Sequence, residues 1–196
     1  MWPPVQGGRP SGDARAPAGP ASLDVGRGHG STGGRAYNRA VTAPDTPRTW
    51  ILTGSPENFE ATRERGFLVV GLKERRRAQA LQIVEDDRIV FYLTRVMRFG
   101  ASVRVTGPLF EDRTPIWPGK PGRPDPYPWR LPTEPEIVLE EPEWIEAETL
   151  APELEHARKW PHEHWRLAFQ GQIRPVSDAD AGLLVDRLHA AAGVRA

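Results

Sequence analysis

The sequence RIVFYLT at residues 88–94 decides the fold, because this apolar run follows a turn at 85–87 and is the clearest strand in the chain. The next strand is predicted at ASVRVT, residues 101–106, and Gly107-Pro108 ends it. Outward from this pair, short apolar runs with turn residues beside them predict strands at 49–53, 67–70 and 136–139, with 144–145 as an extension of the last. Strands therefore dominate the middle of the chain.

Helices are predicted around these strands. Ser55 can cap a helix that has Pro56 at its first position and continues to Arg65, and Gly66 ends it. Further helical segments are predicted at the charged stretch 72–81, which also fits a turn, at 150–158, and at 178–192 with Ser177 as its cap. Strands surrounded by helices predict a mixed α/β (α+β) fold, with a curved or barrel-like sheet flanked by helices.

The overall composition excludes several classes of protein. The chain has 196 residues, and its 26 basic and 26 acidic residues give a formal net charge of zero, so local charge must indicate any nucleic-acid partner. The absence of cysteine excludes disulfides, zinc ribbons and thiol catalysis. No stretch approaches the ~18 consecutive apolar residues of a membrane span. We expect a cytoplasmic protein without a membrane partner, and the sequence leaves the oligomeric state open.

Residues 1–47 differ in composition from the rest of the chain. They are rich in Gly, Pro, Ala and Arg and contain few large apolar residues, so they cannot bury enough apolar surface to offset their ordering entropy. We predict a disordered tail at 1–47 and one folded domain at 48–192. The arginines of the tail could contact nucleic acid weakly, but a linker is the simpler interpretation.

A proline-rich segment at 111–132 carries two tryptophans, Trp117 and Trp129, and one tyrosine, Tyr127. A loop this long inside a compact domain is usually functional or disordered, and the tryptophans favour function. The same segment allows a second interpretation, because proline-rich sequences bind aromatic grooves of partner proteins. A protein-interaction module that uses residues 118–135 therefore stays open.

Basic residues cluster at KERRR, residues 73–77, where Lys73, Arg75, Arg76 and Arg77 are candidates for phosphate contacts. A solvated helix face is the common alternative for such a run. His162 and His164 alternate after Pro161, but no second group of ligands with metal-site spacing accompanies them. We therefore expect no metal ion and no other cofactor.

Four segments in this order resemble the EVE domain. They are WIL at 50–52 leading into SPENF at 55–59, KERRR at 73–77, DRIVFYL at 87–93, and DRTPIWP at 112–118 with YPWR at 127–130. The resemblance covers nearly all of residues 48–190. EVE domains belong with PUA-like domains and are related to YTH domains, which hold 6-methyladenine of RNA in an aromatic cage. The resemblance thus implies a PUA-like fold that binds modified bases in DNA or RNA.

The same resemblance implies a base-binding site. Asn58 falls where YTH domains have a base-contacting asparagine, and Trp117 lies in a loop that resembles the one carrying a cage aromatic. Leu68 stands where YTH domains have a cage tryptophan, so the full cage is not reproduced and the base is left open. Aromatic stacking contributes about 1–3 kcal/mol per base, and an asparagine amide both donates and accepts. The predicted base-binding residues are Asn58, Trp117, Trp50, Thr53, Trp129 and Tyr127, although Trp50 starts a strand and a core position is its simpler interpretation.

An enzyme is the remaining alternative. Some PUA-like relatives are nucleases or act on nucleotides, and Glu57, Glu111 and Asp112 could serve as general acid or base. A carboxylate in the pocket with a strongly shifted pKa would favour catalysis. Non-catalytic binding of a modified nucleotide remains the main prediction, with a concave pocket that holds Asn58 and Trp117 and has residues 73–77 on its rim.

Overall fold

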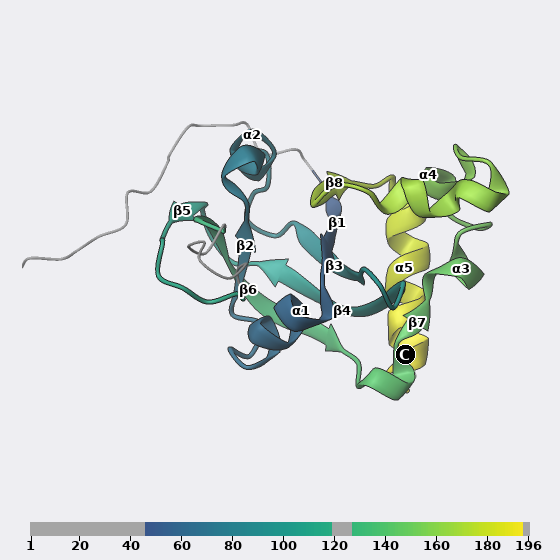
Figure 1. Cartoon of the computed structure of the whole chain (residues 1–196), viewed down its shortest axis with the longest axis horizontal. Coiled ribbons are helices and arrows are strands. Elements are labelled where there is room, and N and C mark those ends of the chain that lie inside the picture. The colour runs from purple at the N-terminus through teal and green to yellow at the C-terminus, as the bar shows by residue number, and fades with distance from the viewer. Residues whose placement is uncertain (1–45, 119–126, 194–196) are drawn as a thin grey trace, which may run out of the picture. The chain divides into compact units, whose positions relative to one another are not determined.

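A mixed sheet flanked by helices makes up the part of the chain that this computed structural model describes, residues 46–118 and 127–193 (Figure 1). The elements in chain order are β1 (Thr49–Gly54), α1 (Pro56–Arg63), β2 (Val69–Leu72), η1 (Glu74–Arg76), α2 (Arg77–Ala80), β3 (Arg88–Leu93), β4 (Arg98–Val105), β5 (Phe110–Glu111), β6 (Trp129–Val138), η2 (Glu141–Glu143), β7 (Ile145–Glu146), α3 (Ala147–Leu150), α4 (Glu155–Arg158), η3 (His162–Phe169), β8 (Ile173–Pro175) and α5 (Asp178–Ala191). The predicted fold class, α+β with a curled sheet, is confirmed.

The sheet has the strand order β2-β6-β4-β3-β1-β8, with β5 beside β6 and β7 beside β4. Strands β1 and β3 run parallel, and every other pair of neighbours in this strand order is antiparallel. Strand β6 changes partner along its length, because Trp129–Pro132 pair with β2 and the residues from Thr133 onward pair with β4. This change of partner curls the sheet and brings β2 round toward α1.

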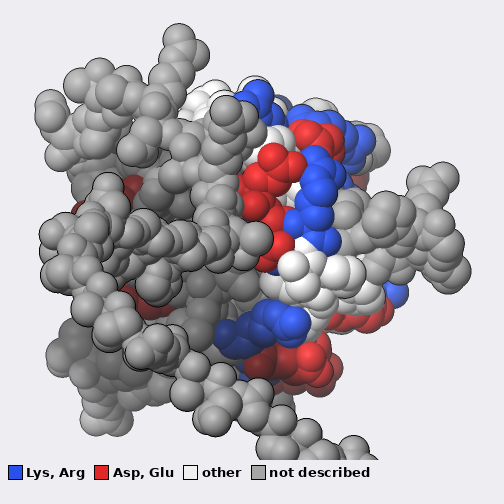
Figure 2. All heavy atoms as spheres, turned by 90° about the vertical axis from the view of Figure 1, so that its left-hand side faces the viewer, with Lys and Arg blue, Asp and Glu red and all other residues white. Residues whose placement is uncertain are grey.

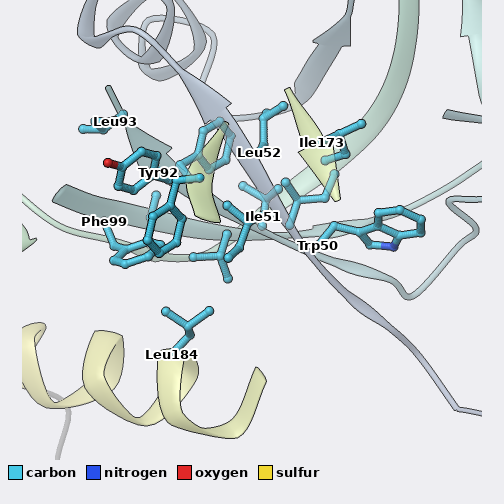
Figure 3. Packing of buried hydrophobic residues seen from close by; sticks show 14 of the residues in the cluster. Trp50, Ile51, Leu52, Tyr92, Leu93, Phe99, Ile173 and Leu184 are labelled. Carbon is cyan, nitrogen blue, oxygen red and sulfur yellow. The ribbon is translucent and has the colours of Figure 1, made fainter. Parts of the chain in front are cut away.

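Large apolar side chains pack on both faces of the sheet, against α1 on one side and in the space next to α5. In β3 every residue from Ile89 to Leu93 is buried, and the Tyr92 ring stacks on Phe169 with 4.5 Å between the ring centres. Figure 3 shows Leu184 of α5 pointing up toward the side chains of the sheet. Each such burial stabilises the fold by about 1.5–3 kcal/mol.

Several predicted elements agree closely with the structure. The strands predicted at 49–53, 88–94 and 101–106 correspond to β1, β3 and β4, and the helix at 178–192 corresponds to α5. Ser55 and Ser177 cap their helices as predicted, with each hydroxyl accepting a backbone N–H three residues later. Residues 72–81 form the short helices η1 and α2.

Other boundaries were predicted wrongly. The strand predicted at 67–70 begins at Val69, because Gly66 and Phe67 both have positive φ, 62° and 58°, and still belong to the turn after α1. The predicted loop 111–132 ends earlier, since β6 starts at Trp129. This strand tolerates Pro132 where it changes partner and Pro135 beside a register shift.

The helix predicted at 150–158 is interrupted, and α3 and α4 are separated by a turn. The strands β5 and β8 were not predicted, because each has too few residues to give a periodic pattern. The tail predicted at 1–47 lies almost entirely outside the described residues. Within the described ranges, no helix is long and apolar enough to cross a membrane.

Candidate functional site

A pocket opens between β1, α1, β2 and the segments that flank β6 and β8. Its cavity volume is about 30 Å³, and its described lining consists of Leu52, Thr53, Gly54, Ser55, Asn58, Phe59, Thr62, Val70, Gly71, Phe91, Leu93, Trp117, Tyr127 and Gln172. Ligand pockets in proteins combine apolar walls with a few polar groups, and this pocket has that composition. Such pockets typically measure roughly 300–1,000 Å³, so a planar ligand has to displace part of the lining to enter this one. We call it the α1 pocket.

Helix α1 supplies the polar side chains of the α1 pocket. The Ser55 cap fixes the start of the helix, so Asn58 and Thr62, four residues apart, lie on the same face. The Asn58 Nδ2 group donates to the Tyr127 hydroxyl at 2.7 Å, and the Thr62 hydroxyl donates to the Asn58 carbonyl oxygen at 2.9 Å. The amide of Asn58 is thereby oriented within the pocket wall.

Four contacts fix Trp117, and one of them is the Arg130 guanidinium, which lies 5.3 Å from the centre of its ring. Its indole Nε1 donates to Thr62 Oγ1 at 2.8 Å, and its ring meets the edge of Tyr127 with 5.5 Å between centres. The ring also lies directly on Gly71, where an added Cβ would be only 2.2 Å from the indole. Only glycine leaves room for the ring at this position, so the backbone of β2 forms part of the floor beneath Trp117.

Gln172 joins three segments of the pocket wall. Its side-chain Oε1 accepts from the Lys73 backbone N–H at 2.9 Å, and its Nε2 donates to the Gly71 carbonyl at 3.2 Å. Its own carbonyl accepts from Thr53 N at 2.7 Å, while the Thr53 hydroxyl donates to the Phe169 carbonyl at 3.1 Å. No sequence pattern pointed to Gln172, because its role depends on the pairing of β8 with β1, which has no periodic signal.

The structure thus brings together four of the six predicted base-binding residues, Asn58, Trp117, Thr53 and Tyr127. Trp50 is different: it is 1% exposed, and its Nε1 donates to the buried carboxylate of Asp87 at 2.8 Å. Trp129 is buried in β6 with the Arg77 guanidinium 5.0 Å from its ring. Neither tryptophan lines the α1 pocket, so both assignments are corrected: their strands direct these rings into the fold.

Leu68 was predicted to stand in place of a cage tryptophan, and it does not belong to the pocket. Its side chain is 62% exposed, because the turn at Gly66 and Phe67 rotates the chain before β2 begins. Val70 and Gly71, the next residues of β2, line the pocket instead. The aromatic walls of the α1 pocket therefore come from Phe59, Phe91 and the two rings of the loop that precedes β6.

The predicted basic run does not act as one surface. The Lys73 ammonium lies 5.7 Å from the ring centre of Tyr127, so this residue borders the α1 pocket. Arg75 is exposed, Arg76 is half-buried, and Arg77 lies over Trp129, outside the pocket. Figure 2 shows acidic and basic side chains interspersed on the visible part of the face that it draws.

The carboxylates considered for catalysis lie outside the α1 pocket, and no Asp or Glu is among its described lining residues. A hydrogen bond from Arg95 lowers the pKa of the exposed Glu57 to about 2. Burial acts to raise the pKa of Asp112, but hydrogen bonds from Thr114 and the charge of Arg130 outweigh it and hold that pKa below its usual value. Both groups are therefore ionised at neutral pH and unsuited to proton transfer there.

Comparison with known proteins gives fold relatives only. No family model matches the chain, and no curated protein matches it. Among solved structures, the Mmi1 YTH domain superimposes with a TM-score of 0.55 at 8% identity, over 76% of this chain and 79% of that one. The YTH domain of Zygosaccharomyces rouxii MRB1, solved with N6-methyladenosine RNA, gives 0.52 at 12% identity, over 78% and 91%.

A third similar structure is Rpa0253 from Rhodopseudomonas palustris, with a TM-score of 0.50 at 10% identity over 73% of this chain and 94% of that one. At these identities the likeness concerns the fold. The curled mixed sheet with flanking helices is the arrangement that these structures share with the chain. The described part of the chain therefore has a YTH-like, PUA-like fold.

Proposed function

We propose that the chain binds a modified nucleobase, flipped out of a DNA or RNA strand into the α1 pocket, without altering it chemically. The observation that carries this proposal is the convergence of Asn58, Trp117 and Tyr127, which the chain holds far apart in sequence, on one pocket. A flipped base is recognised by stacking on such rings and by hydrogen bonds to its edge.

The state of the Asn58 amide supports this proposal. Its Nδ2 group is used by the Tyr127 hydroxyl, while its Oδ1 has no hydrogen-bond partner among the described residues. An acceptor held in this way suits the exocyclic amino group of adenine or cytosine, which donates a hydrogen bond. Methylation at that amino group leaves one N–H for Asn58 and adds a methyl group for the aromatic walls.

The fold relatives point in the same direction. The MRB1 YTH domain was solved with N6-methyladenosine RNA, and a further Mmi1 YTH structure, with a TM-score of 0.50 at 9% identity, was solved with RNA. We assign the domain to the EVE type on the four sequence segments described above. Leu68 stands where YTH domains have a cage tryptophan, so the preferred base can differ from 6-methyladenine. The test below therefore includes several modified bases.

The absence of carboxylates from the described pocket lining favours binding over catalysis. An enzyme acting at this site would need a proton acceptor or donor near the ligand. Asn, Thr, Gln and Tyr side chains orient a ligand by hydrogen bonds but transfer protons poorly at neutral pH. We therefore expect a ligand bound in the α1 pocket to be released chemically unchanged. Mass spectrometry of the recovered oligonucleotide checks this.

The test is binding of the full chain to short single-stranded oligonucleotides, as DNA and as RNA. The panel carries 6-methyladenine, 5-methylcytosine, 5-hydroxymethylcytosine and unmodified bases at two salt concentrations. We expect tighter binding of one modified base, with affinity reduced about fivefold or more in Asn58→Ala and in Trp117→Ala. Loss of one stacking ring, about 1–3 kcal/mol, corresponds to a reduction of this size.

Trp160→Ala is the matched control, because Trp160 is 42% exposed and does not line the α1 pocket. This variant is expected to bind the panel as the unchanged chain does. Binding that depends on salt but not on base modification would contradict the proposal, since it would indicate a general electrostatic surface. Equal losses in Trp160→Ala and Trp117→Ala would contradict it as well.

A further inference from the structure

Two guanidinium groups meet beside Gly171, immediately before the wall residue Gln172. A Cβ built on Gly171 would lie 3.0 Å from Arg174 Nη2 and 3.5 Å from Arg76 Nη2, so both nitrogens approach one point in space. Arg76 ends η1 and Arg174 belongs to β8. The fold thus places two positive charges together from segments about a hundred residues apart. We call Arg76 and Arg174 the arginine pair.

The arginine pair has no counter-charge among the described residues. Neither guanidinium forms an ion pair with a carboxylate there, and the Nε atoms of both are buried without a hydrogen-bond partner. Arg174 Nη1 donates to the Ala168 carbonyl and lies 3.2 Å from His156 Nε2, so its contacts are to uncharged or basic groups. Two like charges in a half-buried place repel each other and are costly without an anion.

Other arginines of the sheet show how this chain usually places such charges. Arg88 of β3 pairs with Glu136 of β6 at 2.5 Å, with β4 between the two strands, and Arg104 of β4 pairs with Glu134 of the neighbouring β6. Burial, together with the charge of Arg76, holds the pKa of Arg174 below its ordinary value, although an arginine remains charged at neutral pH. The arginine pair is therefore a place where the described structure holds two adjacent positive charges without a carboxylate partner.

Gly171 keeps this place open. Its φ of 96° is a conformation that side chains disfavour, and a Cβ here would lie 3.0 Å from Arg174 Nη2, tighter than an ordinary contact. Because Gly171 is exposed, a ligand can approach the arginine pair over its bare backbone. The backbone geometry thus leaves room for an anion where two guanidinium groups converge.

The arginine pair adjoins the α1 pocket. Gln172, next to Gly171, lines that pocket and accepts from the Lys73 backbone N–H at 2.9 Å. Arg76 follows Lys73 by one turn, with its own N–H donated to the Lys73 carbonyl at 2.7 Å. The same wall segment therefore carries pocket residues on one side and the arginine pair next to them.

We propose that Arg76 and Arg174 form a phosphate site that binds a backbone phosphate of the strand whose base occupies the α1 pocket. Arginine suits this role, because its planar fork donates two hydrogen bonds to phosphate oxygens. This inference rests on the proposed function for the identity of the strand. The phosphate chemistry of the site itself rests only on the arginine pair.

The first test uses inorganic phosphate with the ¹⁵N-labelled full chain, and follows the arginine Nε–H signals by NMR at constant ionic strength. We expect saturable shifts of the Arg76 and Arg174 signals, which Arg76→Gln or Arg174→Gln abolishes. Two variants are used because Arg174 also contacts Ala168 and His156. Equal, unsaturated shifts of all arginine signals, or none at the pair, would overturn the proposal.

The second test measures the affinity of an oligonucleotide that carries the preferred base. Arg76→Gln is expected to weaken binding about tenfold at low salt and to reduce the salt slope by about one, at every base. Arg187→Gln removes the same charge from α5, where Arg187 pairs with Glu153 at 2.9 Å, and is expected to leave affinity unchanged. Equal weakening by both variants would show a general charge effect and overturn the phosphate site.

The two proposals fail separately. If the α1 pocket binds no base, phosphate still shifts the signals of the arginine pair, and Asn58→Ala leaves those shifts in place. If the arginine pair binds no phosphate, the base preference and its loss in Asn58→Ala remain, while Arg76→Gln has no effect. Each result therefore addresses one site.

Discussion

Trp50 and Trp117 are both buried tryptophans whose indole N–H is donated at 2.8 Å, yet they belong to regions of different character. Trp50 donates to Asp87, a fully buried carboxylate that also accepts the backbone N–H groups of Arg48 and Val84. Trp117 donates to a threonine hydroxyl, rests on Gly71 and lines the α1 pocket.

The comparison teaches that burial alone does not distinguish a core tryptophan from a ligand-binding one. In the Trp50 region the ring is part of a strand, and a charged acceptor ties it to two neighbouring segments. In the Trp117 region a loop places the ring against Gly71, and the α1 pocket lies beside the ring. The difference lies in what surrounds each ring, and each prediction below tests that difference.

The largest effect is expected from Trp50→Ala. Removing this ring leaves a cavity and deprives Asp87 of a donor, so the free energy of unfolding should fall by about 4 kcal/mol. Urea denaturation followed by circular dichroism measures the change. A loss below about 1 kcal/mol would show that Trp50 is not the core residue that the comparison requires.

Gly71→Ala tests the Trp117 region alone, because the added Cβ would meet the Trp117 ring and not the surroundings of Trp50. The new methyl group would overlap the indole, so we expect about 2 kcal/mol of destabilisation and at least tenfold weaker binding of the preferred oligonucleotide. Gly182→Ala is the control, since a Cβ there meets no atom within 4 Å and the residue lies within α5. Unchanged affinity in Gly71→Ala would break the link between Trp117 and binding.

Thr62→Val sharpens the comparison by removing a hydroxyl while keeping the side-chain shape. Trp117 then loses its acceptor, and the Asn58 carbonyl loses a donor, so stability should fall by about 1.5 kcal/mol. Binding should weaken a few-fold, because the ring keeps its contact with Gly71 but is less firmly oriented. Affinity and urea denaturation are measured on the same preparation, and a stability loss with unchanged affinity would contradict the orienting role.

The smallest effect is expected at Glu57, which is exposed and lines neither the Trp50 region nor the α1 pocket. The hydrogen bond from Arg95 lowers its pKa to about 2 from 4.5, and an NMR titration should show this value. A lowered pKa in the folded state contributes stability above pH 4.5 that is lost as the pH falls through about 2. Arg95→Gln should return the pKa toward 4.5 with little change in stability at pH 7, since exposed pairs contribute little. An unchanged pKa in that variant would show that Arg95 is not its cause.

Much of the fold followed from local patterns. The apolar run at 88–94, the capping serines Ser55 and Ser177, and the breaker Gly66 each act within a few residues, so β3, α1 and α5 were predicted with accurate starts. The start of β6 at Trp129 was missed, because Pro132 is compatible with a strand only where that strand changes partner. Such a change depends on segments that lie elsewhere in the sequence.

The sequence by itself determined the α+β class, the helix that presents Asn58, and the loop that carries Trp117, because caps, breakers and apolar runs act locally. Only the tertiary structure decided which aromatic rings face a cavity, since Trp50 and Trp117 differ in the partners that the sheet brings to them. It also brought Arg174 beside Arg76 and Gln172 into the pocket wall, through the pairing of β8 with β1. These contacts join residues about a hundred positions apart, and no local preference encodes them.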